Sequence, residues 1–421
     1  MKKVEKEKQK NNFTKLTHKR GISLIVLIVT IIVIIILAAA VILTITKNNP
    51  VSSAKEATFK EDMANIQDEL SMYISKKYTY DPLSFEKSSV NLSGDSMVTE
   101  LPSTKKYKDK ISVVEGKLTL YDDKVNSDEK KWFIEVVGDS IIESIRPEWQ
   151  DTISKVKYGV PIPKGFTYKE GTKDTGLVIK DDNENEFVWI PVKENTYVKD
   201  TQNFGGAKIS GEDSSLPNGI TDEETDVKKY GGFYIGRYEA GIPEGDTSSS
   251  NKSGTPVSKK GATVWTDITY YSAKAKAEGM ISTDYVQTGL ITGKAWDTTC
   301  HWIEDSLENT NESATLKNSE YYGNYSDSKM PADVDGYGTK QVAGFSDKWM
   351  IKNIYDLAGN VEEWTNEYDA SYAIYRGNGY IFRGGAYDTS GSEYPVGRRY
   401  AAAGEASANN DIGFRIRLYI K

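Results

Sequence analysis

An uncharged apolar run near the amino terminus constrains this chain more than any other feature. From Ile22 to Ile45 nearly every residue is Ile, Leu, Val or Ala, and no other segment approaches this composition. As a helix, the run would reach about 36 Å, which is enough to cross a hydrocarbon core of about 30 Å with some tilt. A buried core helix would be shorter and would carry polar positions. The run therefore predicts one transmembrane helix in contact with membrane lipid.

The charges on either side of this run predict its orientation. The leader, residues 1–21, holds seven lysines and one arginine against two glutamates. Because positive flanks stay cytoplasmic, we expect a single-pass cell-membrane protein with its amino terminus inside and its later domains extracellular. The formal net charge is −8, and the part after Lys47 is acidic, so no nucleic-acid partner is expected. The single cysteine, Cys300, permits no internal disulfide, so the domains must depend on their cores.

The junction between the leader and the apolar run contains a candidate processing site. The leader ends in Gly21, and Ile22 opens a run that is too long for a secretory signal peptide. This arrangement resembles a type IV prepilin. The resemblance implies cleavage between Gly21 and Ile22, methylation of the new amino terminus, and pilin or secretion-system subunits as partners. Val26 stands where pilins usually carry Glu, which favours a minor or pseudopilin-like subunit; an uncleaved signal anchor is the alternative.

Residues 46–150 are predicted to form a pilin-like helix and a small sheet. Apolar residues spaced by four and three predict an amphipathic helix: Phe59, Met63, Ile66, Leu70 and Tyr73. The segment ISVVEGKLTLYDD predicts two strands around Glu115 and Gly116, and WFIEVVG predicts a third. An unrelated small α+β domain is the alternative. Residues 151–163 are rich in Pro and Gly and are predicted to be a linker.

The second domain, residues 164–421, contains five motifs in order. They are FVWIPV (187–192), GGFYIGRYEAG (231–241), NIYDLAGNVEEWTNE (353–367), FRGGAY (382–387) and GFRIRL (413–418). The aromatic and β-branched runs predict strands, and the alternation in the last predicts a half-exposed closing strand with Arg415 and Arg417 on its outer face. The double glycine at 384–385 predicts a bend where backbones approach closely.

Together the motifs resemble the formylglycine-generating, sulfatase-modifying factor family. The resemblance implies a C-type-lectin-like fold. The expected fold class is therefore α+β: a long amino-terminal transmembrane pilin-like helix with a small β-sheet domain, followed by an irregular, loop-rich, C-type-lectin-like domain. The enzymes of this family bind copper through two cysteines after the RGG motif. No cysteine follows Arg383 here, so neither copper nor formylglycine generation is expected.

Two other candidate sites lie in the same domain. Adjacent Cys300 and His301 would point apart on a regular element, which argues against a Cys/His nucleophile. The family resemblance implies a structural calcium ion at Asn360 and Glu363 with the backbone carbonyl of Val361. Oxygen ligands of this kind suit calcium, although Asn360 shaping a turn beside solvated carboxylates is the alternative.

The segment equivalent to the family's substrate groove supplies the candidate ligand-binding residues. They are Tyr387, Tyr394, Arg398, Arg399, Tyr400, Asn409 and Asn410. Aromatic faces and polar edges suit contact with sugars or peptide. We therefore expect a non-catalytic adhesion protein whose lectin-like domain recognises an extracellular glycan or protein. The alternatives are an enzyme of altered chemistry, or a ligand-binding protein diversified by a retroelement, whose variable regions the ending RGGAY…GRRY…NNDIGFRIRL resembles.

Overall fold

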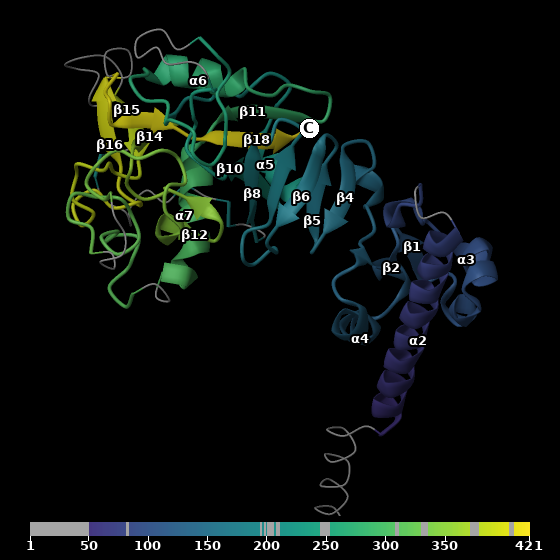
Figure 1. Ribbon diagram of the computed structural model, residues 1–421. Coiled ribbons are helices and arrows are strands. Elements are labelled where there is room, and N and C mark those ends of the chain that lie inside the picture. The colour runs from purple at the N-terminus through teal and green to yellow at the C-terminus, as the bar shows by residue number, and fades with distance from the viewer. Residues whose placement is uncertain are drawn as a thin grey trace, which may run out of the picture. The chain divides into compact units, whose positions relative to one another are not determined.

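The fold divides into two compact units, each considered by itself. The computed structural model (Figure 1) describes residues 50–80, 84–193, 196–197, 199, 206–207, 211–244, 253–307, 311–329, 336–370, 379–403 and 408–421. Unit 1 comprises the described residues up to Leu118 together with Val125–Ser140. Unit 2 comprises Thr119–Lys124 and Ile141–Lys421.

Unit 1 is organised around the long helix α2 (Pro50–Tyr80). Its buried side is the predicted apolar face, with Phe59 and Leu70 at most 5% exposed and Met63 and Ile66 fully buried. The amphipathic helix is therefore confirmed. The shorter helices of this unit are α3 (Gly94–Glu100) and α4 (Ser127–Val137).

The small sheet of this region differs in part from the expectation. Strands β1 (Ile111–Val114) and β2 (Lys117–Tyr121) form at the predicted places, and Glu115 and Gly116 between them have positive φ values of 51° and 71°. Such values suit a tight hairpin. The predicted strand WFIEVVG is instead the end of α4, with Gly138 as its C-cap residue. A capping box overrides its strand propensity, because Asn126 Oδ1 accepts from Glu129 N at 2.9 Å and the Glu129 carboxylate accepts from Asn126 N at 3.2 Å.

The expected membrane anchor requires correction. Within residues 50–421, as far as they are described, no helix combines the length and apolar character needed to span a membrane. The longest of these helices, α2, is 31 residues long but carries charged side chains such as Lys55 and Glu61. The run Ile22–Ile45 and the processing site Gly21–Ile22 lie outside the described residues. The described residues form a mixed α+β fold with several sheets, and the expected transmembrane helix is not among them.

Unit 2 contains a six-stranded sheet in the order β11-β18-β10-β8-β7-β6. These strands are β6 (Phe166–Glu170), β7 (Val178–Asp181), β8 (Glu186–Pro191), β10 (Gly232–Gly236), β11 (Val286–Leu290) and β18 (Ile416–Ile420), all paired antiparallel. The strand predictions for FVWIPV and FYIG are thus confirmed. The prediction of a half-exposed closing strand was wrong, because β18 lies between β11 and β10 and every residue from Ile416 to Ile420 is buried.

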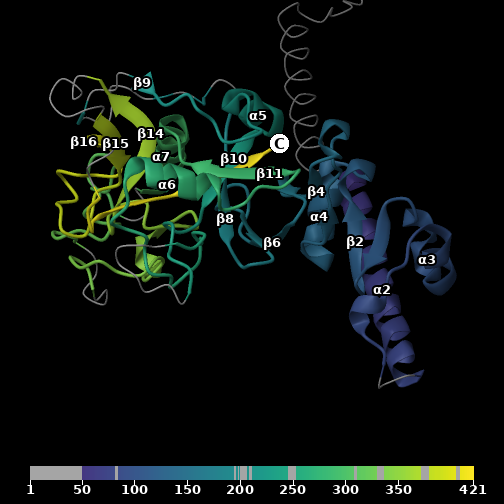
Figure 2. The same cartoon turned by 90° about the horizontal axis from the view of Figure 1, so that it is seen from above.

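A second sheet carries the remaining motifs, in the order β16-β15-β14-β17. Its strands are β14 (Glu362–Asp369), β15 (Gly379–Arg383), β16 (Tyr400–Ala403) and β17 (Ile412–Phe414), and β9 (Gly211–Glu212) pairs with β14. Figure 2 shows these strands together at one side of unit 2, with α7 (Gly293–Leu307) against β14. The other elements of unit 2 are α5 (Glu223–Tyr230), α6 (Tyr270–Glu278), β3 (Ile141–Ile142), β12 (Met350–Ile351) and β13 (Ile354–Tyr355).

Of two local predictions for unit 2, the linker at residues 151–163 is wrong and the double-glycine bend at residues 384–385 is confirmed. Residues 151–163, expected to be a linker, form the antiparallel hairpin of β4 (Ile153–Lys157) and β5 (Val160–Pro163). The double-glycine bend is confirmed. Gly385 has a φ of 72°, and a Cβ there would lie 2.3 Å from the carbonyl oxygen of Tyr394, so only glycine fits without a shift.

Candidate ligand-binding site

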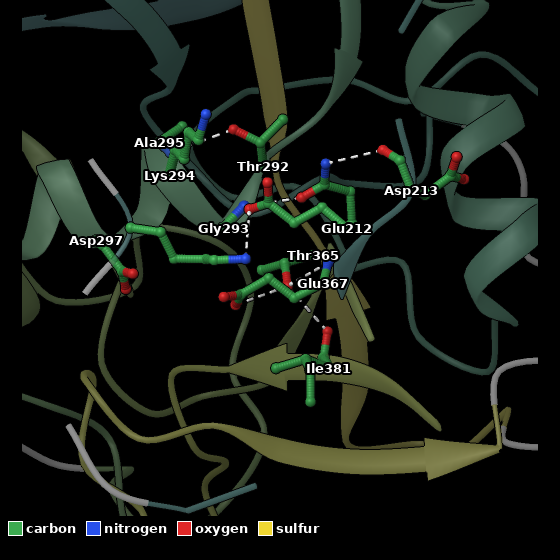
Figure 3. Close-up of polar contacts among 12 residues, drawn as sticks. Glu212, Asp213, Thr292, Gly293, Lys294, Ala295, Asp297, Thr365, Glu367 and Ile381 are labelled. Carbon is green, nitrogen blue, oxygen red and sulfur yellow. Dashed lines mark hydrogen bonds and ion pairs between the residues drawn. The ribbon is translucent and has the colours of Figure 1, made fainter. Parts of the chain in front are cut away.

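Four charged side chains form a buried network beneath the carboxy-terminal segment. We call Asp297, Glu367, Arg383 and Arg399 the ion quartet; their side chains are at most 2% exposed. Arg383 lies 2.8 Å from Asp297 and 3.0 Å from Glu367, and Arg399 lies 2.9 Å from Glu367 and also pairs with Asp297. Figure 3 shows Asp297 and Glu367, which come from α7 and β14. Two carboxylates and two guanidinium groups balance in charge, as buried ions require.

The ion quartet also fixes the backbone that leads to the predicted ligand-binding residues. Arg383 Nε donates to the carbonyl of Arg398 at 3.0 Å, and its Nη2 donates to that of Gly397 at 2.8 Å. Trp296 Nε1 donates to the carbonyl of Val396 at 3.0 Å. Arg399, which was expected to contact ligand, is therefore buried within the ion quartet and does not reach the surface.

On the other face of the same sheet, three aromatic rings surround a small hollow. Side chains alternate along a strand, so Phe382 points away from the ion quartet that its neighbour Arg383 joins. Phe382 is paired in register with Tyr400, their ring centroids lie 5.2 Å apart, and Tyr394 lies 5.6 Å from Tyr400. These rings line what we call the aromatic hollow, together with Glu362, Arg383, Gly385, Pro395 and Arg398. The hollow has a volume of only about 10 Å³, and Tyr400 at its edge is 44% exposed.

The remaining predicted residues lie at the surface nearby. Asn409 and Asn410 are exposed and Tyr387 is half-buried. Burial and the carboxylates of Asp388 and Asp411 raise the pKa of Tyr387, while a hydrogen bond with Asn410 opposes them. The structure thus groups Tyr394, Arg398 and Tyr400 at the hollow, and Tyr387 with Asn410. Glu362, which also lines the hollow, was not among the predicted ligand-binding residues.

Two of the three candidate calcium ligands, Glu363 and Asn360, use their side-chain oxygens to accept hydrogen bonds within the protein. Both carboxylate oxygens of Glu363 bond to Arg415, at 2.6 and 3.0 Å. Asn360 Oδ1 accepts from two N–H donors, those of Asn324 and Gln341, at 3.1 and 2.9 Å. Among the described residues no group of three or more His, Cys, Asp or Glu is arranged to hold a metal. Calcium at Asn360, Val361 and Glu363 stays an untested prediction.

The single thiol is enclosed in the protein. Cys300 lies on α7 and is fully buried, and burial raises its pKa to about 12. His301 faces the other way, with 45% of its side chain exposed and its Nδ1 3.4 Å from the Glu304 carboxylate. The expectation that these neighbours point apart is therefore confirmed.

Comparison with known proteins identifies part of unit 2. The family model for the sulfatase-modifying factor enzyme 1-like domain matches residues 265–418. Similar solved structures include variable protein 1 of Treponema denticola (14% identity over 60% of this chain and 98% of that one, TM-score 0.29) and PvdO from Pseudomonas aeruginosa (15% identity, 58% and 98%, TM-score 0.31). The comparison with curated proteins gives no match. The family match leaves residues 1–264 uncovered, so it gives the pilin-like expectation no support. The matched residues, 265–418, include the ion quartet and the aromatic hollow, so both lie in the part of the chain that is similar to the sulfatase-modifying factor enzyme 1-like domain.

Proposed function

We propose that this domain is a non-catalytic binding module that recognises a glycan or a protein. The observation that carries the proposal is the contrast between the two faces of β15. The ion quartet holds one face rigidly, and on the other face Tyr400 and Tyr394 present rings toward solvent. Exposed aromatic rings on a fixed frame supply contact area with little loss of conformational entropy, which suits recognition.

The thiol chemistry of the chain also supports binding over formylglycine generation. The family's copper site needs two cysteines after the RGG motif, and the chain has Cys300 alone. A thiol that is fully buried, with a pKa of about 12, is neither ionised nor accessible near neutral pH.

A binding screen tests the proposal. The full chain is applied to glycan and extracellular-protein arrays beside the variants Tyr400→Ala and Tyr337→Ala. Tyr337 is 47% exposed, which matches Tyr400 at 44%, but it lies outside the aromatic hollow. We expect at least one array ligand to bind both the parent chain and Tyr337→Ala. The same ligand should not bind Tyr400→Ala.

The competing enzyme hypothesis gives a different result. Oxidation of a sulfatase-type cysteine peptide by the purified chain in the presence of copper would contradict the proposal. A screen in which no glycan or protein is retained would contradict it as well.

A further inference from the structure

One side of α7 borders a pocket that is much larger than the aromatic hollow. Thr298, His301, Trp302 and Asp305 lie three, four and seven residues apart along α7, so their side chains share one side of the helix. With Lys173, Lys193, Lys352 and their neighbours they line a volume of about 480 Å³, which we call the α7 pocket. Ligand pockets commonly range from about 300 to 1,000 Å³, so the α7 pocket can hold a small molecule.

The walls of the α7 pocket are fixed by contacts between backbones. A Cβ on Gly176 would lie 1.9 Å from the carbonyl oxygen of Lys352, so the β6–β7 loop and the β12–β13 turn touch directly. Asn353 Nδ2 donates to the carbonyl of Gly176 at 2.7 Å. Figure 1 shows α7 beside β12, and these two elements are in contact. The α7 pocket therefore lies on elements that the fold holds in place.

Lys352 presents a fixed ammonium group at this pocket. Its Nζ donates to the carbonyl of Trp302 at 2.8 Å and lies 4.5 Å from the Trp302 ring centroid. An ammonium group has three N–H donors, and the described contacts engage one of them. Burial lowers the pKa of Lys352, whereas the carboxylates of Asp305 and Asp174 oppose this. No ion pair of the described residues includes Lys352, so a partly desolvated cation lacks an adjacent anion.

The charges of the lining do not cancel. The lining contains three lysines and two aspartates, which leaves an excess of one positive charge when His301 is neutral: Lys173, Lys193, Lys352, Asp174 and Asp305. A ligand that carries one carboxylate would balance this charge. Its carboxylate could also accept from the N–H donors of Lys352 that are not used within the described part of the protein.

The rest of the lining distinguishes a sugar from a simple anion. Thr298 is 6% exposed, and its Oγ1 is buried with no hydrogen-bond partner. Sugar hydroxyls both donate and accept, so they can bond to this hydroxyl as well as to ammonium and carboxylate groups. Half-buried Pro191, Val192 and Trp302 add apolar surface, which suits the C–H groups of a sugar ring. A lone carboxylate or phosphate would leave most of the 480 Å³ unfilled.

We propose that the α7 pocket binds an acidic sugar residue, with its carboxylate at Lys352 and its hydroxyl groups at Thr298 and the two aspartates. The chemical class of the ligand is a uronic acid or another sugar with one carboxylate. This second site goes beyond the proposed function, which concerns the exposed rings of Tyr394 and Tyr400.

Titration of the full chain with matched sugars tests the inference. Methyl β-D-glucuronide and methyl α-D-galacturonide carry the carboxylate, and methyl β-D-glucoside and methyl α-D-galactoside have a hydroxymethyl group in its place. Calorimetry or NMR titration should show at least one uronide binding about tenfold or more tightly than its neutral counterpart, because a charge-assisted hydrogen bond is lost in the neutral sugar.

Two variants connect this preference to the α7 pocket. Lys352→Met removes the charge and should bind the uronide and its neutral counterpart equally, while Lys348→Met, at an exposed lysine outside the pocket, should keep the preference. Thr298→Val should weaken uronide binding several-fold without lowering the unfolding temperature, since the hydroxyl that it removes has no partner.

Four results would overturn the inference. The first is equal binding of the uronides and the neutral sugars. The second is binding of acetate or phosphate as tightly as the uronides, which indicates a simple anion site. The third is an unchanged preference in Lys352→Met with its unfolding temperature also unchanged. If Lys352→Met does not fold, unchanged uronide affinity in Thr298→Val is the contradicting result.

Failure of this inference is separable from failure of the proposed function. Tyr400→Ala should bind the uronides as the parent chain does. Uronide binding without any array ligand that Tyr400→Ala loses would support the α7 pocket and contradict the proposed function. An array ligand that Tyr400→Ala loses, without any uronide binding, would contradict the α7 pocket alone.

Discussion

The guanidinium of Arg383 lies 3.0 Å from the carboxylate of Glu367, and both side chains are fully buried. Glu367 also pairs with Arg399, the residue directly before β16. One carboxylate therefore interacts with two guanidinium groups, that of Arg383 at the end of β15 and that of Arg399. The ion quartet therefore connects the core of unit 2 to the residues that line the aromatic hollow.

Removing one carboxylate of the ion quartet should destabilise unit 2 strongly. Glu367→Ala leaves two guanidinium groups buried with a single carboxylate, and breaking a buried ion pair in this way costs about 3 to 5 kcal/mol. Urea unfolding of the full chain measures the loss. Lys260→Ala, which removes the exposed 2.8 Å pair with Asp347, is the control and should cost less than about 1 kcal/mol. Similar losses in both variants would show that burial does not govern these pairs.

The thiol of Cys300 should be unreactive in the folded protein. Its full burial and its pKa of about 12 leave almost no accessible thiolate at pH 8. Labelling with iodoacetamide, followed by mass spectrometry, should be slower by roughly a hundredfold or more in the folded chain than in urea. Equal labelling rates in the two states would contradict the buried position of α7 in the core.

Sequence patterns predicted the strands of unit 2 correctly, but they did not predict which of its charged side chains are buried. The runs at β8 and β10 and the bend at Gly385 depend on neighbouring residues, so local patterns suffice. The burial of Arg415 and Arg417 depends on Glu363 and Glu223, which are 52 and 194 residues away. Nothing local to GFRIRL shows these partners, and the alternation alone suggested solvent.

The candidate site shows the same limit on a smaller scale. Glu362 and Glu363 look alike in the sequence, and both were interpreted as solvated if calcium was absent. Because side chains alternate along β14, Glu363 and Glu362 lie on opposite faces of the strand. Glu363 pairs with Arg415, and Glu362 lines the aromatic hollow. In unit 1, by contrast, a local signal existed: Asn126 followed three residues later by Glu129 is a capping box, and it identifies α4 as a helix.

A cluster of buried acids predicts that stability falls as pH rises. Burial, together with the negative charge of Glu363, raises the pKa of Asp356 to about 7, and burial and its acidic neighbours raise that of Glu239. The folded state then binds more protons than the unfolded state between about pH 4 and 7, so stability is lost as pH rises through that range. The lowered pKa of Asp213, about 2, acts below this window.

Urea unfolding at pH 5, 6 and 7.5 measures the dependence. We expect the free energy of unfolding to fall by a few kcal/mol across this range. Asp356→Asn should flatten the slope, since its amide oxygen can keep the 2.6 Å bond from Gly344 N without a titrating proton. A free energy of unfolding that increases with pH in the parent chain would show that these acids are ionised in the folded state.

The retroelement hypothesis predicts a specific pattern of variation among close relatives. If the segment is diversified for ligand binding, substitutions should concentrate at exposed or half-buried positions: Tyr387, Tyr394, Tyr400, Asn409 and Asn410. Arg383 and Arg399 should stay unchanged, because replacing either leaves buried carboxylates without charge balance. Sequencing the gene from related strains checks this pattern. Equal variation in the ion quartet and at the surface would contradict diversification. Substitutions in the ion quartet would disturb the buried ion pairs that position the variable surface residues.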